Sequence, residues 1–335
     1  MVATSTTSPR TSSPEPDSVA SEAAPENASS RPTVIVLNPT AGRGRAGRMW
    51  RSVSGELGCW PSMPQIVETQ RAGHGTEIAR AAVGRGAGLV VAAGGDGTAH
   101  EVVQGLMEGD AGASATAFAH VPLGTGCDLA RGLGLPTRPE GILRGLRQGH
   151  EVHLDIGVAD MCADAETVRR YFLNVATIGL GPAVALRVKR SRWLQRLGKH
   201  AYTLASLQEI IGARPRQVSW HTDDGRRGDT LLLQMFICNG PSIAGGMRPA
   251  PEASFDNGEL HVVMAGPLSL SVALSQFRRL DRGIPFDHPQ ITSLACRSID
   301  LDGAAIDVET DGEVAGGLPA RLSLRPGGLL VRMPA

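Results

Sequence analysis

Aromatic residues are scarce in this chain of 335 residues, at 4 % of the sequence, and there is no surplus of either charge. Lys and Arg together number 33, and so do Asp and Glu. Proteins that bind nucleic acid usually carry a basic surplus or exposed rings on which bases stack. We therefore expect no nucleic-acid partner.

The chain also lacks a CxxC pair, since its five cysteines are widely spaced. Neither a zinc knuckle nor a disulfide framework is expected. No apolar run reaches the ~20 residues that a membrane-spanning helix needs. Residues 1–31 are rich in Ser, Thr, Pro, Ala and Glu and have no secretory signal, so we expect a disordered tail. A cytoplasmic protein is expected, with peripheral docking at the inner face of the membrane left open.

Apolar, β-branched runs alternate with helical patterns between residues 32 and 148. Helices are expected near residues 47–57, 76–83 and 98–107, and strands at Thr33–Leu37, Gln65–Thr69, Leu89–Ala93 and Ala117–Val121. This alternation predicts an N-terminal Rossmann-like α/β domain with a parallel sheet. Ligands bind such sheets beyond the carboxyl ends of the strands. Three glycine-rich loops begin at those ends, at residues 38–47, 94–98 and 124–128.

Residues 149–335 change to short alternating segments separated by turns such as Pro326-Gly327-Gly328. Two helices are expected, near Trp193–Ile211 and Ser269–Leu280. Strands are expected at Val152–Val158, Tyr171–Thr177, Gln217–His221, Leu231–Cys238, Leu260–Met264, Ser298–Leu301, Ala305–Glu309, Arg321–Leu324 and Leu329–Arg332. The pattern predicts a second, antiparallel β-rich domain.

The motif Gly42-x-Gly44-x-x-Gly47 imitates the glycine fingerprint of dinucleotide-binding proteins. Four residues separate it from the preceding strand, however, and Arg43, Arg45 and Arg48 crowd the turn. A basic loop that faces phosphate is therefore favoured over a dinucleotide site. The sequence GxxxxGK[ST] is absent, so any use of ATP does not involve a P-loop.

Gly94-Gly95-Asp96-Gly97-Thr98 directly follows an apolar strand. The glycines permit a sharp turn with exposed amides, and the following helix N-terminus offers an anion site. An aspartate beside phosphate calls for a metal ion or a substrate hydroxyl. The alternative is an ordinary turn in which Thr98 caps the helix. Residues 122–128, Pro-Leu-Gly-Thr-Gly-Cys-Asp, repeat the arrangement after the next strand.

These loops resemble, in this order, the signature loops of the diacylglycerol kinase catalytic-domain family, which includes sphingosine and ceramide kinases and bacterial lipid kinases. The resemblance runs from Pro32 to Pro334. Further segments that resemble the family are Thr69-x-x-Ala72-Gly73-His74, Asn174–Gly181, Gly198-Lys199-His200-Ala201-Tyr202 and Asp311-Gly312-Glu313.

The resemblance implies a two-domain kinase in which ATP lies between the α/β domain and a C-terminal antiparallel β-sandwich that binds the acceptor. By analogy Asp311 deprotonates the acceptor hydroxyl, Asp96 lies near Mg²⁺ or shares the role of base, and Glu313 belongs to the same catalytic motif. Phosphoryl transfer depends on such positioning and charge neutralisation. The residues expected to hold ATP are Asn38, Thr69, Gly94, Gly95, Asp96, Gly97, Thr98, His100, Gly124 and Thr125.

The chain departs from the family at three places. Cys127 and His100 stand where the family usually has asparagine, and a thiol is a weak substitute for an amide. Related lipid kinases bind a structural magnesium with an aspartate just before the glycine of a later turn. Here Asn257 takes that place, which leaves a site at Asp256, Asn257 and Glu259 open.

Residues 187–199 contain no acid and surround Trp193 with basic side chains, namely Arg187, Lys189, Arg190, Arg192, Arg196 and Lys199. A basic segment with an interfacial tryptophan suits an anionic membrane surface. The alternatives are a solvated helix face or contacts with ATP phosphates.

We expect an ATP- and Mg²⁺-dependent kinase that phosphorylates a hydroxyl of a lipid, diacylglycerol or a sphingoid base. A kinase of the same fold for a soluble hydroxylated metabolite and a nucleotide-binding protein without catalysis are the alternatives. An apolar tunnel in the second domain would favour the first over the second. An Asp311 that faces the cleft would argue against the third. The acceptor and a homodimeric state stay open.

Overall fold

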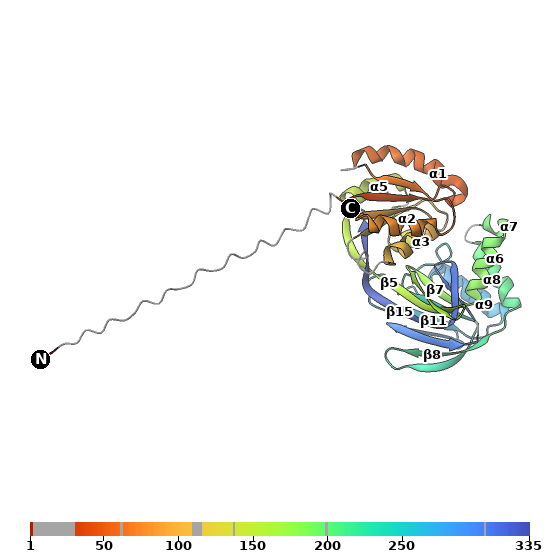
Figure 1. The fold of residues 1–335 in the computed structure, drawn as a ribbon. Coiled ribbons are helices and arrows are strands. Elements are labelled where there is room, and N and C mark those ends of the chain that lie inside the picture. Colours follow the sequence, from red (N-terminus) through yellow and green to blue (C-terminus); the bar gives the residue numbers. More distant parts are fainter. Residues whose placement is uncertain (3–30, 61–62, 109–115, 137, 198–199, 305) are drawn as a thin grey trace.

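The computed structural model describes residues 1–2, 31–60, 63–108, 116–136, 138–197, 200–304 and 306–335. The tail expected at residues 1–31 lies almost entirely outside these ranges. The chain folds into two successive domains, an N-terminal α/β domain and a C-terminal β-sandwich (Figure 1).

A parallel sheet forms the α/β domain, in the strand order β4-β3-β1-β2. Helices α1 and α5 cover one face and α2 and α3 cover the other (Figure 1). The elements are β1 (Thr33–Leu37), α1 (Ala41–Val53), η2 (Ser54–Cys59), β2 (Gln65–Glu68), α2 (His74–Gly84), β3 (Leu89–Gly94), α3 (Asp96–Met107), β4 (Ala117–Pro122), α4 (Asp128–Gly132) and α5 (Pro139–Gln148).

Strand β1 shows why the sheet carries helices on both faces. Val34 and Val36 pack in the core beneath α2 and α3, whereas Ile35 and Leu37 pack in the core beneath α1 and α5. Alternate residues of a strand point to opposite faces, so a continuous apolar run buries both. The predicted α/β fold is confirmed.

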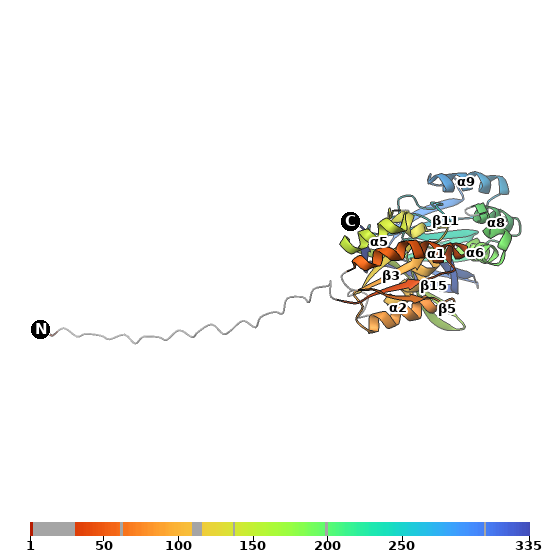
Figure 2. The same ribbon diagram turned by 90° about the horizontal axis from the view of Figure 1, so that it is seen from above.

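The second layer is an antiparallel β-sandwich, also as predicted. Helices α6, α7, α8 and α9 lie together at one side of it (Figure 1, Figure 2). Its elements are β5 (His150–Ala163), β6 (Glu166–Phe172), β7 (Val175–Gly179), α6 (Leu180–Arg190), α7 (Arg192–Gln195), α8 (His200–Ile211), β8 (Arg216–Thr222), β9 (Arg227–Leu232), β10 (Gln234–Cys238), β11 (Leu260–Ala265), α9 (Leu270–Arg282), β12 (Ile291–Cys296), β13 (Ser298–Gly303), β14 (Asp307–Thr310) and β15 (Glu313–Met333).

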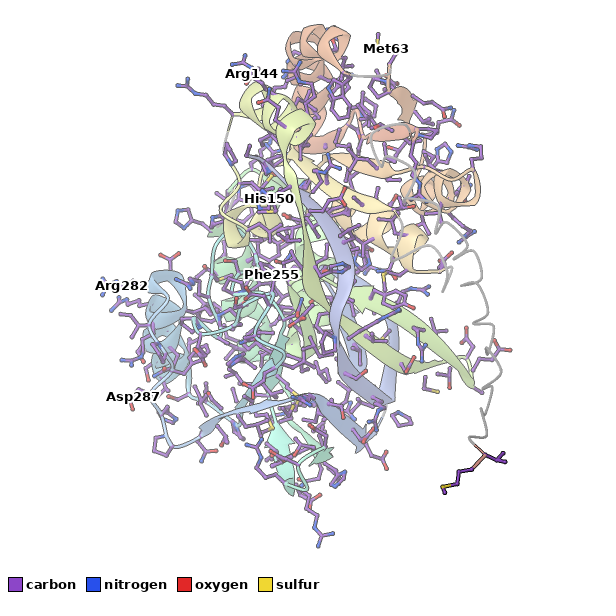
Figure 3. All side chains as sticks on the ribbon, turned by 90° about the vertical axis from the view of Figure 1, so that its left-hand side faces the viewer. Met63, Arg144, His150, Phe255, Arg282 and Asp287 are labelled. Carbon is purple, nitrogen blue, oxygen red and sulfur yellow. The ribbon has the colours of Figure 1, made fainter. Side chains whose placement is uncertain are left out.

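Two long strands, β5 and β15, connect the layers. They pair antiparallel along most of their length, and the end of β15 also pairs parallel with β4, Val331 opposite Phe118. The last strand of the chain therefore extends the N-terminal sheet. Phe255, shown inside the molecule in Figure 3, packs in the same core cluster as Leu106 and Leu129 of the α/β domain.

Several expected segments have different boundaries. The turn expected at Pro326-Gly327-Gly328 is a bulge inside β15, which joins two expected strands into one. Gly327 has φ +56°, and its N–H donates to Asp155 Oδ1 at 2.8 Å. The strand expected at Tyr171–Thr177 is divided into β6 and β7. The single helix expected at Trp193–Ile211 is α7 and α8, with residues 198–199 outside the described ranges.

Candidate active site

Asn38 ties the loop after β1 to the start of α3. Its Nδ2 donates to Thr98 Oγ1 at 3.1 Å, and its Oδ1 accepts from the backbone N–H (3.1 Å) and the hydroxyl (2.8 Å) of Thr40. Thr98 lies inside α3 and makes no side-chain cap, so the part of the alternative in which Thr98 caps the helix is wrong. The first turn of α3 keeps unpaired N–H groups that can bind an anion.

The glycine loops after β3 and β4 touch each other. A Cβ on Gly124 would lie 2.5 Å from the Gly95 Cα, and a Cβ on Gly94 would lie 2.3 Å from Thr98 Oγ1. Glycine is required at both positions, because a side chain at Gly124 would push the two loops apart and one at Gly94 would collide with Thr98. Thr125, at the tip of the second loop, is exposed. The structure thus brings the predicted loop residues together at one edge of the sheet.

Two carboxylates lie around Gly126. A Cβ on this glycine would be 3.1 Å from Asp96 Oδ2 and 3.7 Å from Asp128 Oδ2. Burial, and next the charge of Asp96, raise the pKa of Asp128 to about 6. Asp96 Oδ1 accepts from Leu129 N–H at 3.1 Å, and its Oδ2 has no hydrogen-bond partner among the described residues. Mg²⁺ prefers carboxylate oxygens and takes few from the protein, so this pair fits that ion.

Cys127, between these carboxylates in sequence, has left-handed backbone with φ +50°. Burial, and next the charge of Asp96, raise the pKa of its thiol to about 12. The side chain therefore stays an uncharged thiol near neutral pH. It is neither a nucleophile nor a strong hydrogen-bond partner here.

Asp311 lies where the second domain meets the first. Its Oδ2 accepts from Leu173 N–H at 2.6 Å, and its Oδ1 accepts from the N–H groups of Asn174 (2.9 Å) and Val175 (3.1 Å). These bonds occupy the N–H groups that would otherwise continue the strand between β6 and β7. His100 of α3 approaches from the other domain, with Nδ1 3.6 Å from Asp311 Oδ2.

Glu309 is a buried carboxylate that sequence reasoning did not place in the site. Its Oε2 accepts from Thr177 Oγ1 at 2.6 Å and its Oε1 accepts from Gly312 N–H at 2.5 Å. Complete burial is the main cause that raises its pKa to about 7. The available signal was its position two residues before Asp311, although Asp311 itself lies in the turn between β14 and β15.

Tyr202 of α8 shows that these groups surround a common space. Its pKa rises to about 12, first through burial and then through the charges of Glu309, Asp128 and Asp96. These carboxylates come from both domains.

Other predicted residues lie apart from this cluster. Glu313 is half exposed and forms an ion pair of 2.9 Å with Lys189 of α6. Thr69 donates its backbone N–H to Leu37 O at 2.8 Å. The turn that follows Thr69 is held by Glu101 of α3, a role that sequence reasoning missed, through the N–H groups of Gly73 and Gly75.

The turn predicted to hold a structural metal is organised by hydrogen bonds. Asn257 Nδ2 lies 3.0 Å from His261 Nε2, and Asn257 Oδ1 accepts from Glu259 N–H at 3.2 Å. Asp256 accepts from the Ser254 hydroxyl. Within the described ranges, no group of three or more His, Cys, Asp or Glu side chains is placed to hold a metal ion. A metal at this turn stays a prediction.

Basic residues of α6 and α7 are partly paired. Arg187 forms an ion pair with Glu209 and Lys189 with Glu313, while the side chain of Trp193 is 58 % exposed. Arg190 and Arg196 are exposed as well. The side chains of Arg192 and Lys199 lie outside what the structure describes.

Comparison with known proteins agrees with this geometry. The sequence model of the diacylglycerol kinase catalytic domain matches residues 32–159, and that of the YegS C-terminal NAD kinase beta sandwich-like domain matches residues 174–333. This chain belongs to the diacylglycerol kinase catalytic-domain family. It is a kinase, as its loops predicted. No helix in the described ranges is long and apolar enough to cross a membrane.

Relatives of the chain cover most of its length. It is 30 % identical over 268 residues to the "Probable lipid kinase YegS-like" of Chromohalobacter salexigens, covering 79 % of this chain and 82 % of that one. It is 29 % identical over 255 residues to a diacylglycerol kinase of Mycobacterium tuberculosis, covering 76 % and 79 %. The crystal structure of a diacylglycerol kinase from Bacillus anthracis has a TM-score of 0.68 at 20 % identity, covering 90 % and 97 %.

Proposed function

We propose that this kinase transfers the γ-phosphate of ATP to a hydroxyl of a lipid, diacylglycerol or a sphingoid base, with the help of Mg²⁺. The observation that carries the proposal is the meeting of Asp311 from the sandwich with α3 from the α/β domain. A phosphate-binding edge and a carboxylate that acts on a hydroxyl then share one cleft. That is the arrangement phosphoryl transfer needs.

The nucleotide would be held at the edge formed by the glycine loops. The free N–H groups at the start of α3 and the loop at Gly124 and Thr125 offer hydrogen-bond donors to phosphate. Asn38 fixes the position of α3 relative to β1 through Thr98. These residues bind and orient the substrate while leaving its terminal phosphate free to react.

Asp96 and Asp128 would hold Mg²⁺, because one carboxylate oxygen of each lies within 4 Å of the position that a Cβ on Gly126 would take. When bound, the ion neutralises charge on the phosphate oxygens. Arg131 donates to Asp128 Oδ1 at 2.7 Å and orients that carboxylate. The acceptor hydroxyl must also lose a proton, which Asp311 or its neighbour His100 would receive.

A lipid acceptor is supported by the surface beside α6 and α7. Trp193 and Leu186 are exposed there together with Arg190 and Arg196. Exposed apolar side chains among arginines bind the interface of an anionic membrane. Peripheral docking at this surface would bring the cleft near its substrate.

A soluble hydroxylated metabolite is the second candidate acceptor. It is favoured by a groove of about 910 Å³ on the sandwich, beside the β5–β6 hairpin and β13, whose lining includes several charged side chains. Its charged lining residues are Asp160, Glu166, Arg227, Asp229, Asp300, Asp302 and Arg321.

The experiment is ATP consumption by the purified protein with Mg²⁺, measured with micelles of diacylglycerol and anionic lipid and, in parallel, with a water-soluble metabolite extract. Radiolabelled phosphate on lipid supports the proposal. Turnover with the extract alone would establish the soluble acceptor. If ATP were bound but not consumed in either assay, the protein would be a nucleotide-binding protein without catalysis.

A further inference from the structure

His100 carries a buried polar atom that nothing in its surroundings satisfies. Its Nδ1 is enclosed and has no hydrogen-bond partner, and the side chains of His100 and Asp311 are only 6 % and 3 % exposed. A buried, unpaired imidazole nitrogen is costly, so such an atom calls for a functional explanation. The nearest acidic oxygen is Asp311 Oδ2, at 3.6 Å.

The carboxylate of Asp311 is fixed in place. Both of its oxygens accept backbone N–H bonds, three in all, from residues 173–175. Hydrogen bonds of this kind favour the ionised form of a carboxylate and prevent the side chain from rotating. A carboxylate so held is well suited to orient a neighbour and poorly suited to move toward a substrate proton.

The second ring nitrogen of His100, Nε2, has surroundings that differ from those of Nδ1. Among the described residues Nδ1, but not Nε2, is a buried atom without a partner, and Nε2 makes no hydrogen bond. Nε2 is therefore not fully enclosed. With Nδ1 nearest to Asp311, the ring has one end toward a carboxylate, and its other nitrogen has no partner among the described residues.

Other charged groups around the ring do not compete for Nδ1. Glu101 on the same helix is turned toward α2, where it accepts from Gly73 and Gly75. Asp96 lies one turn earlier on α3 and binds Leu129 N–H. On β6, the backbone of Tyr171 binds Gln104. From β14, Glu309 is directed at Thr177 and Gly312.

We propose that His100 is the general base of the kinase and that Asp311 is the positioning residue that holds its Nδ1–H. This inference rests on the proposed transfer to a hydroxyl. The acceptor O–H gives its proton to His100 Nε2 while the acceptor oxygen bonds to the γ-phosphorus. The bond between that phosphorus and the bridging oxygen of ADP breaks, and the imidazolium later releases its proton to water.

The distance of 3.6 Å between His100 Nδ1 and Asp311 Oδ2 is longer than a hydrogen bond. Catalytic hydrogen bonds are often long in proteins without substrate and shorten when the substrates bind. His100 belongs to α3 and Asp311 to the sandwich, so approach of the two domains on a nucleotide would shorten this contact. A histidine oriented by a carboxylate at one nitrogen and acting on a hydroxyl with the other is a proven arrangement for proton transfer.

Kinetics with the whole chain and diacylglycerol micelles test the role. His100→Gln should lower kcat by ~10²–10⁴-fold at pH 8, the usual contribution of a general base, with KM for ATP nearly unchanged. In the unaltered enzyme kcat should fall at low pH, where the imidazole of His100 is protonated, and this fall should be absent from His100→Gln. Added imidazole should restore part of the activity of His100→Ala. A His100→Gln enzyme with kcat within about threefold of the unaltered one would overturn the proposal and leave Asp311 as the base.

A second readout does not depend on lipid turnover. In ¹⁵N-histidine spectra, the signals of the His100 ring are identified as those missing from the His100→Gln variant. At pH 8, with Mg²⁺ and a non-hydrolysable ATP analogue, this ring should carry its proton on Nδ1. Asp311→Asn should shift that preference. A proton on Nε2 in the unaltered protein would contradict the inference whatever the substrate. Absence of lipid phosphorylation with the expected Nδ1 proton would instead refute only the lipid acceptor.

Discussion

The carboxylate of Asp128 accepts a hydrogen bond of 2.7 Å from the backbone N–H of Gly245. This bond joins the glycine loop after β4 to a loop of the sandwich, so the residue proposed to hold Mg²⁺ also spans the two domains. Its pKa of about 6, raised by burial and by Asp96, makes a nearby positive charge favourable. Binding of Mg²⁺ at this residue, as proposed above, would therefore be coupled to the relative position of the domains.

Asp128→Asn should raise the Mg²⁺ concentration for half-maximal activity about tenfold or more, because one of two carboxylates is lost. The amide oxygen can still accept from Gly245, so the fold should persist. Asp287→Asn, an exposed change in the loop after α9, is the matched control. An unchanged Mg²⁺ requirement in Asp128→Asn would remove Asp128 from the metal site.

Glu309 should make stability depend on pH. Its pKa is about 7 in the folded chain and near 4.5 when unfolded, so between these values the native state binds more protons. Stability must then fall as pH rises from about 4.5 to 7. At about 1.4 kcal/mol per unit, the full effect is on the order of 3 kcal/mol.

Urea unfolding at pH 5 and pH 8 measures this effect. Glu309→Gln should weaken the dependence, since the amide can accept from Gly312 and donate to the Thr177 hydroxyl. Glu166→Gln at an exposed position is the control and should leave the dependence intact. If the free energy of unfolding changed between pH 5 and pH 8 by the same amount in the Glu309→Gln and unaltered proteins, Glu309 would be ionised at neutral pH.

Cys127→Asn should stabilise the chain. The position has φ +50°, a left-handed conformation that asparagine adopts more readily than cysteine. We expect a gain of up to about 1 kcal/mol in thermal or urea unfolding, with activity preserved or raised. Cys127→Ala removes the thiol without favouring the backbone and should give no gain. Collapse of activity in the asparagine variant would instead make Cys127 part of a specialised site.

Asp311→Asn should abolish transfer while ATP affinity stays within a few-fold, because the carboxylate orients His100 for proton transfer and is not expected to bind the nucleotide. Calorimetric titration with ATP and lipid phosphorylation assays give the two quantities. Glu313→Gln, at the exposed pair with Lys189, is a useful comparison within the same motif. Equal loss of ATP binding in Asp311→Asn would show that its role is misassigned.

The alternating core of β1 and the loops at Gly94 and Gly124 could be predicted because periodicity and glycine spacing are local signals. The contact of His100 with Asp311 could not, since it depends on how two domains meet. Helix α6 was missed because Gly181 and Pro182 signal a turn. Gly181 is in fact required by packing, as a Cβ there would lie 1.9 Å from Thr177 Oγ1, and proline is tolerated in a first helical turn.

Trp193→Ala should weaken binding to anionic vesicles. The indole is 58 % exposed beside exposed arginines, so it can enter the interface while the arginines attract acidic headgroups. Co-sedimentation with vesicles of phosphatidylglycerol and phosphatidylcholine should show several-fold less bound protein for the variant, and binding should fall with added salt. Leu231→Ala, at an exposed residue of β9, is the matched control. Equal binding of Trp193→Ala and the unaltered chain would place membrane contact elsewhere, because the α7 surface would then contribute no measurable affinity.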